Sequence, residues 1–109
     1  MPHTLIVLAK HHPVPAGFVA VPVHRPFVLG NPFRVAEQGR AACIARFRVW
    51  LWQQLQHDTP QRQEVARLAS LLDTHDVALV CFCKPLACHG DVIAAAIHWW
   101  RRTHDARPS

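Results

Sequence analysis

Residues 81–91, CFCKPLACHGD, hold the side chains of this sequence that are best able to do chemistry. The stretch contains three of the four cysteines of the 109-residue chain, together with a lysine, a histidine and an aspartate. Secreted scaffolds spread their cysteines along the chain, so this crowding indicates a metal site or a reactive thiol instead of a disulfide framework. We therefore expect the thiols to be reduced.

A reactive-thiol site is the first interpretation of this stretch. The loops that follow the carboxyl ends of strands in α/β sheets bind ligands, and a helix N-terminus at that place stabilises a thiolate. Cys88 precedes a predicted helix and is the candidate nucleophile. The groups assigned beside it are His89 as an acid or base, Asp91 as a further catalytic group or a helix cap, and Cys83 and Lys84 as ligand-binding residues.

A structural zinc site is the alternative interpretation of the same residues. The four ligands that structural zinc requires are present as Cys81, Cys83, Cys88 and His89. Their spacing differs from the usual knuckle, in which a C-x2-C turn is repeated at a distance, and it makes tetrahedral coordination by all four awkward. A third interpretation treats Cys81 as a small buried residue of a core strand.

Short apolar runs predict three strands, at residues 4–9, 18–23 and 77–83. Pro22 places the second of these strands at a sheet edge, because proline cannot donate to a ladder. The third run, VALVCFC, is apolar throughout, as expected of a central strand that is covered on both faces. The stretch between residues 24 and 35, with two prolines, a glycine and an asparagine, predicts a shaped loop.

Apolar residues at helical intervals predict three helices, from Arg40 to about Gln56, from Pro60 to about Asp73, and from about Val92 to Trp100. Thr59 is the predicted cap of the second helix. The order β-β-α-α-β-α predicts an α/β sandwich with a short, at least partly parallel sheet. We expect one domain over residues 1–103 and a flexible polar tail over 104–109.

Twelve basic against seven acidic side chains give a formal charge of +5, which indicates an anionic partner, either a small molecule or a nucleic acid. The basic residues are scattered, and helical spacing leaves Trp99 as the aromatic next to Arg101 and Arg102 that is free to stack, so nucleic-acid binding is not favoured. Trp52 lies off the apolar stripe, as a lone exposed aromatic or as part of a partner surface. No stretch has the apolar length of a membrane span, and we expect a cytosolic protein without a membrane partner.

Three segments, HRPFVLGNPF, GRAACIARFRVWL and LVCFCKPLACHGDVI, resemble a small bacterial and phage family, domain of unknown function 4326. The resemblance covers about residues 18–97, and GNPF and CxCxPxxCHGD are its specific motifs. Where family members usually have tyrosine in the first helix, this chain has Phe47. The positions that the resemblance singles out are Arg25, Gly30, Asn31, Pro32, Phe33, Arg40, Cys81, Cys83, Pro85, Cys88, His89 and Asp91.

The resemblance implies a site if the strands before Arg25 and before Lys84 are parallel neighbours. Their following loops then share one rim, where two arginines, a lysine and helix N-termini converge. The ligand-binding positions are Arg25, Gly30, Asn31, Pro32, Phe33 and Arg40. We expect this rim to bind an anionic, phosphorylated small molecule, nucleotide-derived in the favoured case, and to act on it through Cys88. No cofactor is expected, with zinc as the alternative.

Overall fold

The strands of the computed structural model, which describes residues 3–24, 27–33, 39–81 and 89–104, form one parallel sheet. They are β1 (Leu5–Ala9), β2 (Phe18–Pro22) and β3 (Asp76–Cys81). The sheet order is β1-β3-β2, so the most apolar strand is central and Pro22 lies in an edge strand, as the sequence predicts. Val21 of β2 and Val7 of β1 both lie opposite Leu79 of β3.

The helices of the described chain are α1 (Gly39–Gln54), α2 (Pro60–Leu71) and α3 (His89–His104). The element order β-β-α-α-β-α and the α/β class are confirmed. The Thr59 hydroxyl accepts a hydrogen bond from the backbone N–H of Arg62 at 3.1 Å, and Pro60 occupies the first turn, so α2 begins as its sequence predicts.

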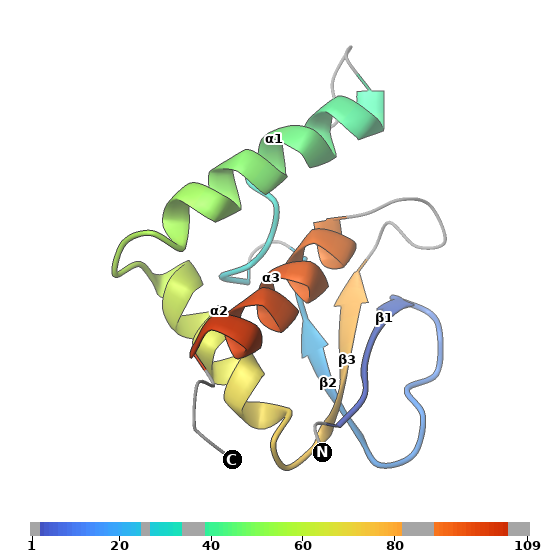
Figure 1. Cartoon of the computed structure of the whole chain (residues 1–109). Coiled ribbons are helices and arrows are strands. Elements are labelled where there is room, and N and C mark those ends of the chain that lie inside the picture. The colour runs from blue at the N-terminus through green and yellow to red at the C-terminus, as the bar shows by residue number, and fades with distance from the viewer. Residues whose placement is uncertain (1–2, 25–26, 34–38, 82–88, 105–109) are drawn as a thin grey trace.

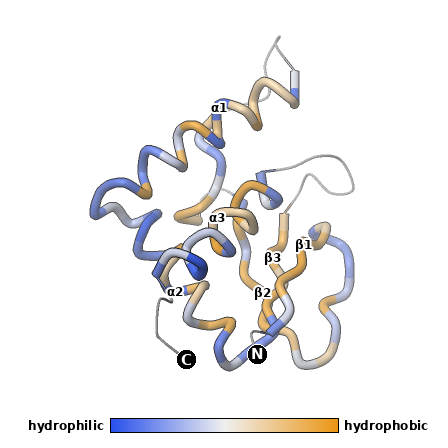
Figure 2. Tube along the Cα trace, in the orientation of Figure 1, coloured by the Kyte–Doolittle hydropathy of each residue, from blue (hydrophilic) through white to orange (hydrophobic). Residues whose placement is uncertain are grey.

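Helix α3 lies against β1 and β3, and α1 and α2 pack on α3 (Figure 1). The strands are hydrophobic along most of their length, whereas each helix alternates hydrophobic and polar positions (Figure 2). The core lies between the sheet and the three helices, where burying apolar surface is the main source of stability. Its largest fully buried side chains include Val77, Leu79, Phe47, Leu51, Leu68, Ile93 and Ile97.

Helix α3 is longer at both ends than the apolar pattern of residues 92–100 predicts. It begins at His89 and continues to His104, whose ring stacks on Trp100 with the ring centroids 3.7 Å apart. Arg101 joins this last part of α3 to the end of α2. Its guanidinium forms a salt bridge of 2.9 Å to Asp73 and donates a hydrogen bond to the backbone oxygen of Ala69. The remainder of the expected tail lies outside the described residues.

The two tryptophans that the sequence left exposed lie against each other. Trp52 of α1 and Trp99 of α3 meet edge to face, with the ring centroids 4.5 Å apart. Trp52 is nevertheless 45% exposed, and Trp99 is half-buried. Trp99 is therefore not a free stacking platform, and this contact adds no support for nucleic-acid binding.

Within the described residues, none of the helices combines the length and the apolar composition needed to cross a membrane.

Candidate functional site

The carboxyl ends of β2 and β3 lie side by side at one rim of the sheet, which is the condition that the sequence set for a shared site. Pairing continues beyond the last strand residue, because the backbone N–H of Val23 donates to the oxygen of Val80 at 3.1 Å. Figure 1 shows α3 beginning beside this rim, next to the tip of β3. In open α/β sheets this edge is the usual place for a ligand.

His89, the first residue of α3, contacts the ends of both strands through its buried side chain. Its side chain is buried, with 6% exposed. Nε2 lies 2.6 Å from the backbone oxygen of Val23, and Nδ1 lies 3.6 Å from Sγ of Cys81. Because a carbonyl oxygen only accepts, Nε2 must carry a hydrogen, which leaves Nδ1 to accept from the thiol in a neutral ring.

Phe47 of α1 fixes the other side of the His89 ring. The two rings meet edge to face at 5.2 Å between centroids, and Phe47 is fully buried. The histidine therefore ties β2, β3 and α1 to the start of α3. A role for His89 in proton transfer stays a prediction, and the structure adds a positioning role that the sequence did not indicate.

Asp91 is exposed in the first turn of α3. A carboxylate at this place interacts favourably with the positive end of the helix dipole. Asp91 lies two residues inside the helix, so the described geometry agrees with a dipole-stabilising group. Its catalytic role stays a prediction.

The GNPF motif, residues 30–33, forms a turn that is held against α1. Asn31 Oδ1 accepts a hydrogen bond of 2.8 Å from the backbone N–H of Phe33, and the N–H of Gly30 donates to Phe27 at 2.8 Å. Asn31 Nδ2 donates to Sγ of Cys43 at 3.5 Å, and that thiol lies 3.4 Å from the Phe33 oxygen. The asparagine side chain therefore bonds both its own loop and α1, and Pro32 is exposed beside it.

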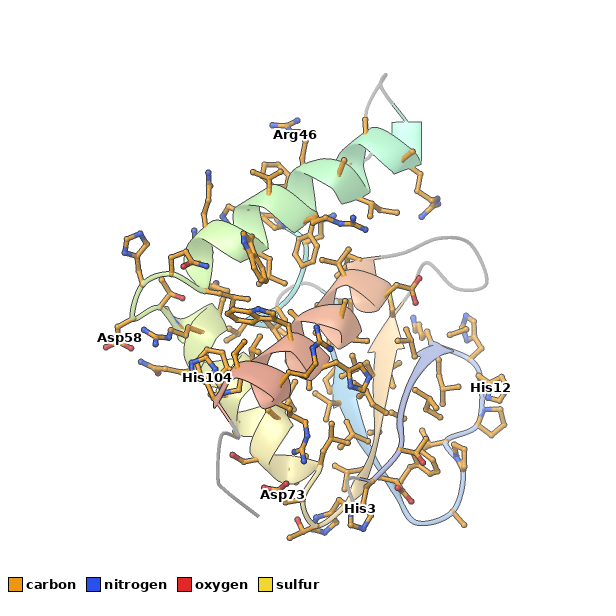
Figure 3. The ribbon with its side chains drawn as sticks, viewed as in Figure 1. His3, His12, Arg46, Asp58, Asp73 and His104 are labelled. Carbon is orange, nitrogen blue, oxygen red and sulfur yellow. The ribbon has the colours of Figure 1, made fainter. Side chains whose placement is uncertain are left out.

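Phe33 packs on the outer side of α1. Its ring meets Trp50 edge to face at 6.4 Å between centroids, and the guanidinium of Arg46 lies over it at 4.5 Å. Figure 3 shows Arg46 on the side of α1 that points away from α3. Arg40, in the first turn of α1, is half-buried, and no hydrogen bond or ion pair within the described chain joins it to His89 or to Asn31.

The remaining predicted site residues, Arg25, Cys83, Lys84 and Cys88, lie outside the described residues. Of the alternative zinc ligands, Cys81 and His89 are described and are neighbours. In the part of the chain that the structure describes, no group of three or more histidine, cysteine or acidic side chains is placed to hold a metal ion.

One feature of the site was missed in the sequence. Cys43 was not among the predicted site residues, but it is the side chain on which the GNPF turn rests. The proximity of Cys81 to His89 was expected only in the zinc interpretation, in which both are ligands. The sequence offers one signal for this contact: the two residues stand eight positions apart, one at the end of a predicted strand and the other just before a predicted helix.

A family model, "Domain of unknown function (DUF4326)", matches residues 7–99, which is most of the chain. The chain belongs to the DUF4326 family. This match confirms the resemblance to the family, and it extends from within β1 to most of α3. A comparison with curated proteins and with solved structures finds no match.

The thiol of Cys81 is expected to resist alkylation in this DUF4326 domain. The side chain is fully buried, so reagent reaches it only after an opening of the fold. An opening free energy of about 3 kcal/mol makes reaction with iodoacetamide about a hundredfold slower than in urea. Mass spectrometry of timed alkylation measures this, and Cys88 is predicted to react faster than an ordinary free cysteine. Equal rates for Cys81 in buffer and in urea would contradict the burial.

Proposed function

We propose that the rim where β2 and β3 end binds a phosphorylated or otherwise anionic small molecule. The observation that supports this most directly is the hydrogen bond of 2.6 Å between His89 Nε2 and the Val23 oxygen. This bond holds the first turn of α3 at the ends of both strands. The first N–H groups of a helix have no partner within the helix, and together with the helix dipole they favour an anion.

Two cations follow the same strand ends in the sequence. Arg25 comes three residues after Pro22, the last residue of β2, and Lys84 comes three residues after Cys81, the last residue of β3. Three residues span at most about 11 Å, so chain length alone keeps both within reach of the rim. A fork of charged donors suits phosphate, and a nucleotide-derived ligand is the favoured member of that class.

Cys88 is the group on which we place any covalent step at this rim. It immediately precedes the first residue of α3, and a thiol at a helix N-terminus is in general a better nucleophile because the positive end of the helix dipole favours the thiolate. His89 and Asp91 follow it directly in the sequence. In the described geometry the His89 ring is turned to Val23 and Cys81, so we expect its contribution to be chiefly to hold the helix start in position.

The experiment is a calorimetric titration of the protein at low salt with inorganic phosphate, adenosine monophosphate and ribose phosphate. The Arg25→Gln and Lys84→Gln variants are expected to weaken the preferred ligand about tenfold each, as loss of a charged hydrogen bond predicts. Arg67→Gln is the matched control, because it removes one positive charge from α2, where Arg67 is paired with Glu64 at 2.7 Å. Absence of saturable binding, or equal weakening by the control, would refute the proposal.

A structural zinc ion at the same rim is a second candidate, favoured by one distance. In a tetrahedral site with Zn–S of about 2.3 Å and Zn–N of about 2.0 Å, sulfur and nitrogen lie about 3.5 Å apart. Sγ of Cys81 and Nδ1 of His89 lie 3.6 Å apart. The two of them would need Cys83 and Cys88 to complete four ligands, and the domain would then serve as a zinc-stabilised interaction module.

Elemental analysis separates the two candidates. A zinc site predicts about one zinc ion per purified chain and a large fall in melting temperature on addition of a chelator. Absence of zinc, with a melting temperature indifferent to chelator, would remove this candidate and leave the anion site untouched.

A further inference from the structure

A groove with a volume of about 990 Å³ lies between α1 and α3, and neither the family motifs nor the rim accounts for it. Both helices run in the same direction across the molecule, from upper right to lower left in Figure 1. The lining residues on α3 extend from Asp91 to Arg102, a distance of about 16 Å along the helix. Among the described residues, Asp91 is the lining residue that also belongs to the candidate rim site.

The groove is hollow because α3 presents alanines where larger residues would fill the space. Ala95 is exposed and Ala96 is buried, and both line the groove opposite α1. Leu51 and Val92 are buried lining residues, which makes the inner surface apolar. The contact between Trp52 and Trp99 adds an aromatic wall.

Large apolar side chains that line the groove are exposed to solvent. Val49 is 58% exposed and Trp52 is 45% exposed, and both line the groove. Exposed apolar surface that is gathered in one concave place is typical of a binding site, whereas single exposed residues need no explanation. The volume lies at the upper end of the range of about 300–1,000 Å³ for small-molecule sites.

The charged side chains that line the groove favour a ligand with a negative charge. Arg48 and Arg102 line it against one acidic residue, Asp91. Asp91 has an interaction of its own, whereas within the described chain the guanidinium groups of the two arginines make no hydrogen bond or ion pair. An apolar site with two uncommitted guanidinium groups is complementary to a carboxylate, sulfonate or phosphate that is attached to an apolar body.

We propose that the groove between α1 and α3 binds an organic anion with an aromatic or otherwise extended apolar body. The apolar body lies over Leu51, Val92 and Ala96, and a guanidinium group pairs with the anionic end. This site does not require an anion at the rim of the sheet, so each of the two sites can be tested without the other.

The first test is a fluorescence titration with anilinonaphthalene sulfonate, an aromatic anion of the proposed class. We expect one saturable site per chain, with quenching of tryptophan emission as Trp52 and Trp99 transfer energy to the dye. Ala95→Leu fills the groove and is expected to weaken binding at least tenfold. Ala41→Leu is the matched control, because Ala41 is an exposed alanine of α1 outside the groove, and it should change binding less than twofold.

The second test separates the contribution of charge to dye binding from the contribution of hydrophobic contact. The double variant Arg48→Gln, Arg102→Gln is expected to weaken the sulfonate dye about tenfold and the neutral dye N-phenylnaphthylamine less than twofold. Val49→Glu, at an exposed position, adds a negative charge without touching the core, so it keeps the test valid if Ala95→Leu fails to fold. Equal effects on both dyes, or no effect of Ala95→Leu or Val49→Glu, would overturn the proposal.

A macromolecular occupant would give a different result. If a second copy of the chain covered the groove, dye binding would fall as protein concentration rises, and sedimentation would show a dimer that Val49→Glu dissociates. That outcome would also overturn the proposal of a small-molecule site.

Discussion

Replacement of His89 by alanine is expected to lower the free energy of unfolding by about 3 kcal/mol. The carbonyl of Val23 would lose a buried hydrogen-bond partner, and the missing ring would leave a cavity beside Phe47. For a domain of this size, about 3 kcal/mol corresponds to a fall of at least about 12 °C in melting temperature. Urea unfolding followed by circular dichroism measures the change.

His98→Ala is the matched control for this variant. His98 lies on the same helix but is exposed, so its loss should change stability by less than about 0.5 kcal/mol. If His89→Ala cost no more than this control, the ring would not join the strand ends to α3.

Phe47→Ala is expected to cost about 3–5 kcal/mol of unfolding free energy. The side chain is fully buried, and its ring contacts both His89 and Trp50, the latter at 5.8 Å between centroids. Phe47→Leu keeps most of the volume and should cost less than about 1.5 kcal/mol. The control is Val49→Ala, two residues further along α1 and 58% exposed, which should be nearly neutral. A small change in the urea unfolding free energy of Phe47→Ala would contradict the central place of Phe47 in the core.

A double-mutant cycle between Phe47 and His89 measures the contact itself. The edge-to-face geometry predicts a coupling energy of about 0.5–1.5 kcal/mol between the two substitutions. Strict additivity would show that the two residues stabilise the domain independently, and that α1 does not hold the helix start through this ring.

The sheet was predictable because its signals are local. The continuously apolar run around Leu79 indicates a central strand, and Pro22 marks an edge strand, whichever helices cover them. Thr59 followed by Pro60 likewise fixes the start of α2 through bonds that span three residues. In these cases, the residues that determine the structure are neighbours in the chain.

The contacts around the site could not be predicted because they join distant segments. His89 and Val23 are 66 residues apart, and the sequence does not show that the histidine ring contacts the end of the second strand until the strands are placed. A ligand-binding role for Asn31 stays a prediction, and the contact of its amide with Cys43 of α1 was not predicted. That contact depends on how the loop and α1 are packed together, and no local periodicity reports it.

Nuclear magnetic resonance of the labelled protein during a phosphate titration tests most directly whether the rim binds an anion. We predict saturable shifts that are largest at the backbone amides of His89, Gly90 and Asp91, in the first turn of α3, and that require about tenfold more phosphate in Arg25→Gln. Amides at the far end of α3, near His104, should move little. Shifts that are absent at low salt, or that are spread evenly along α3, would contradict an anion site at the ends of β2 and β3.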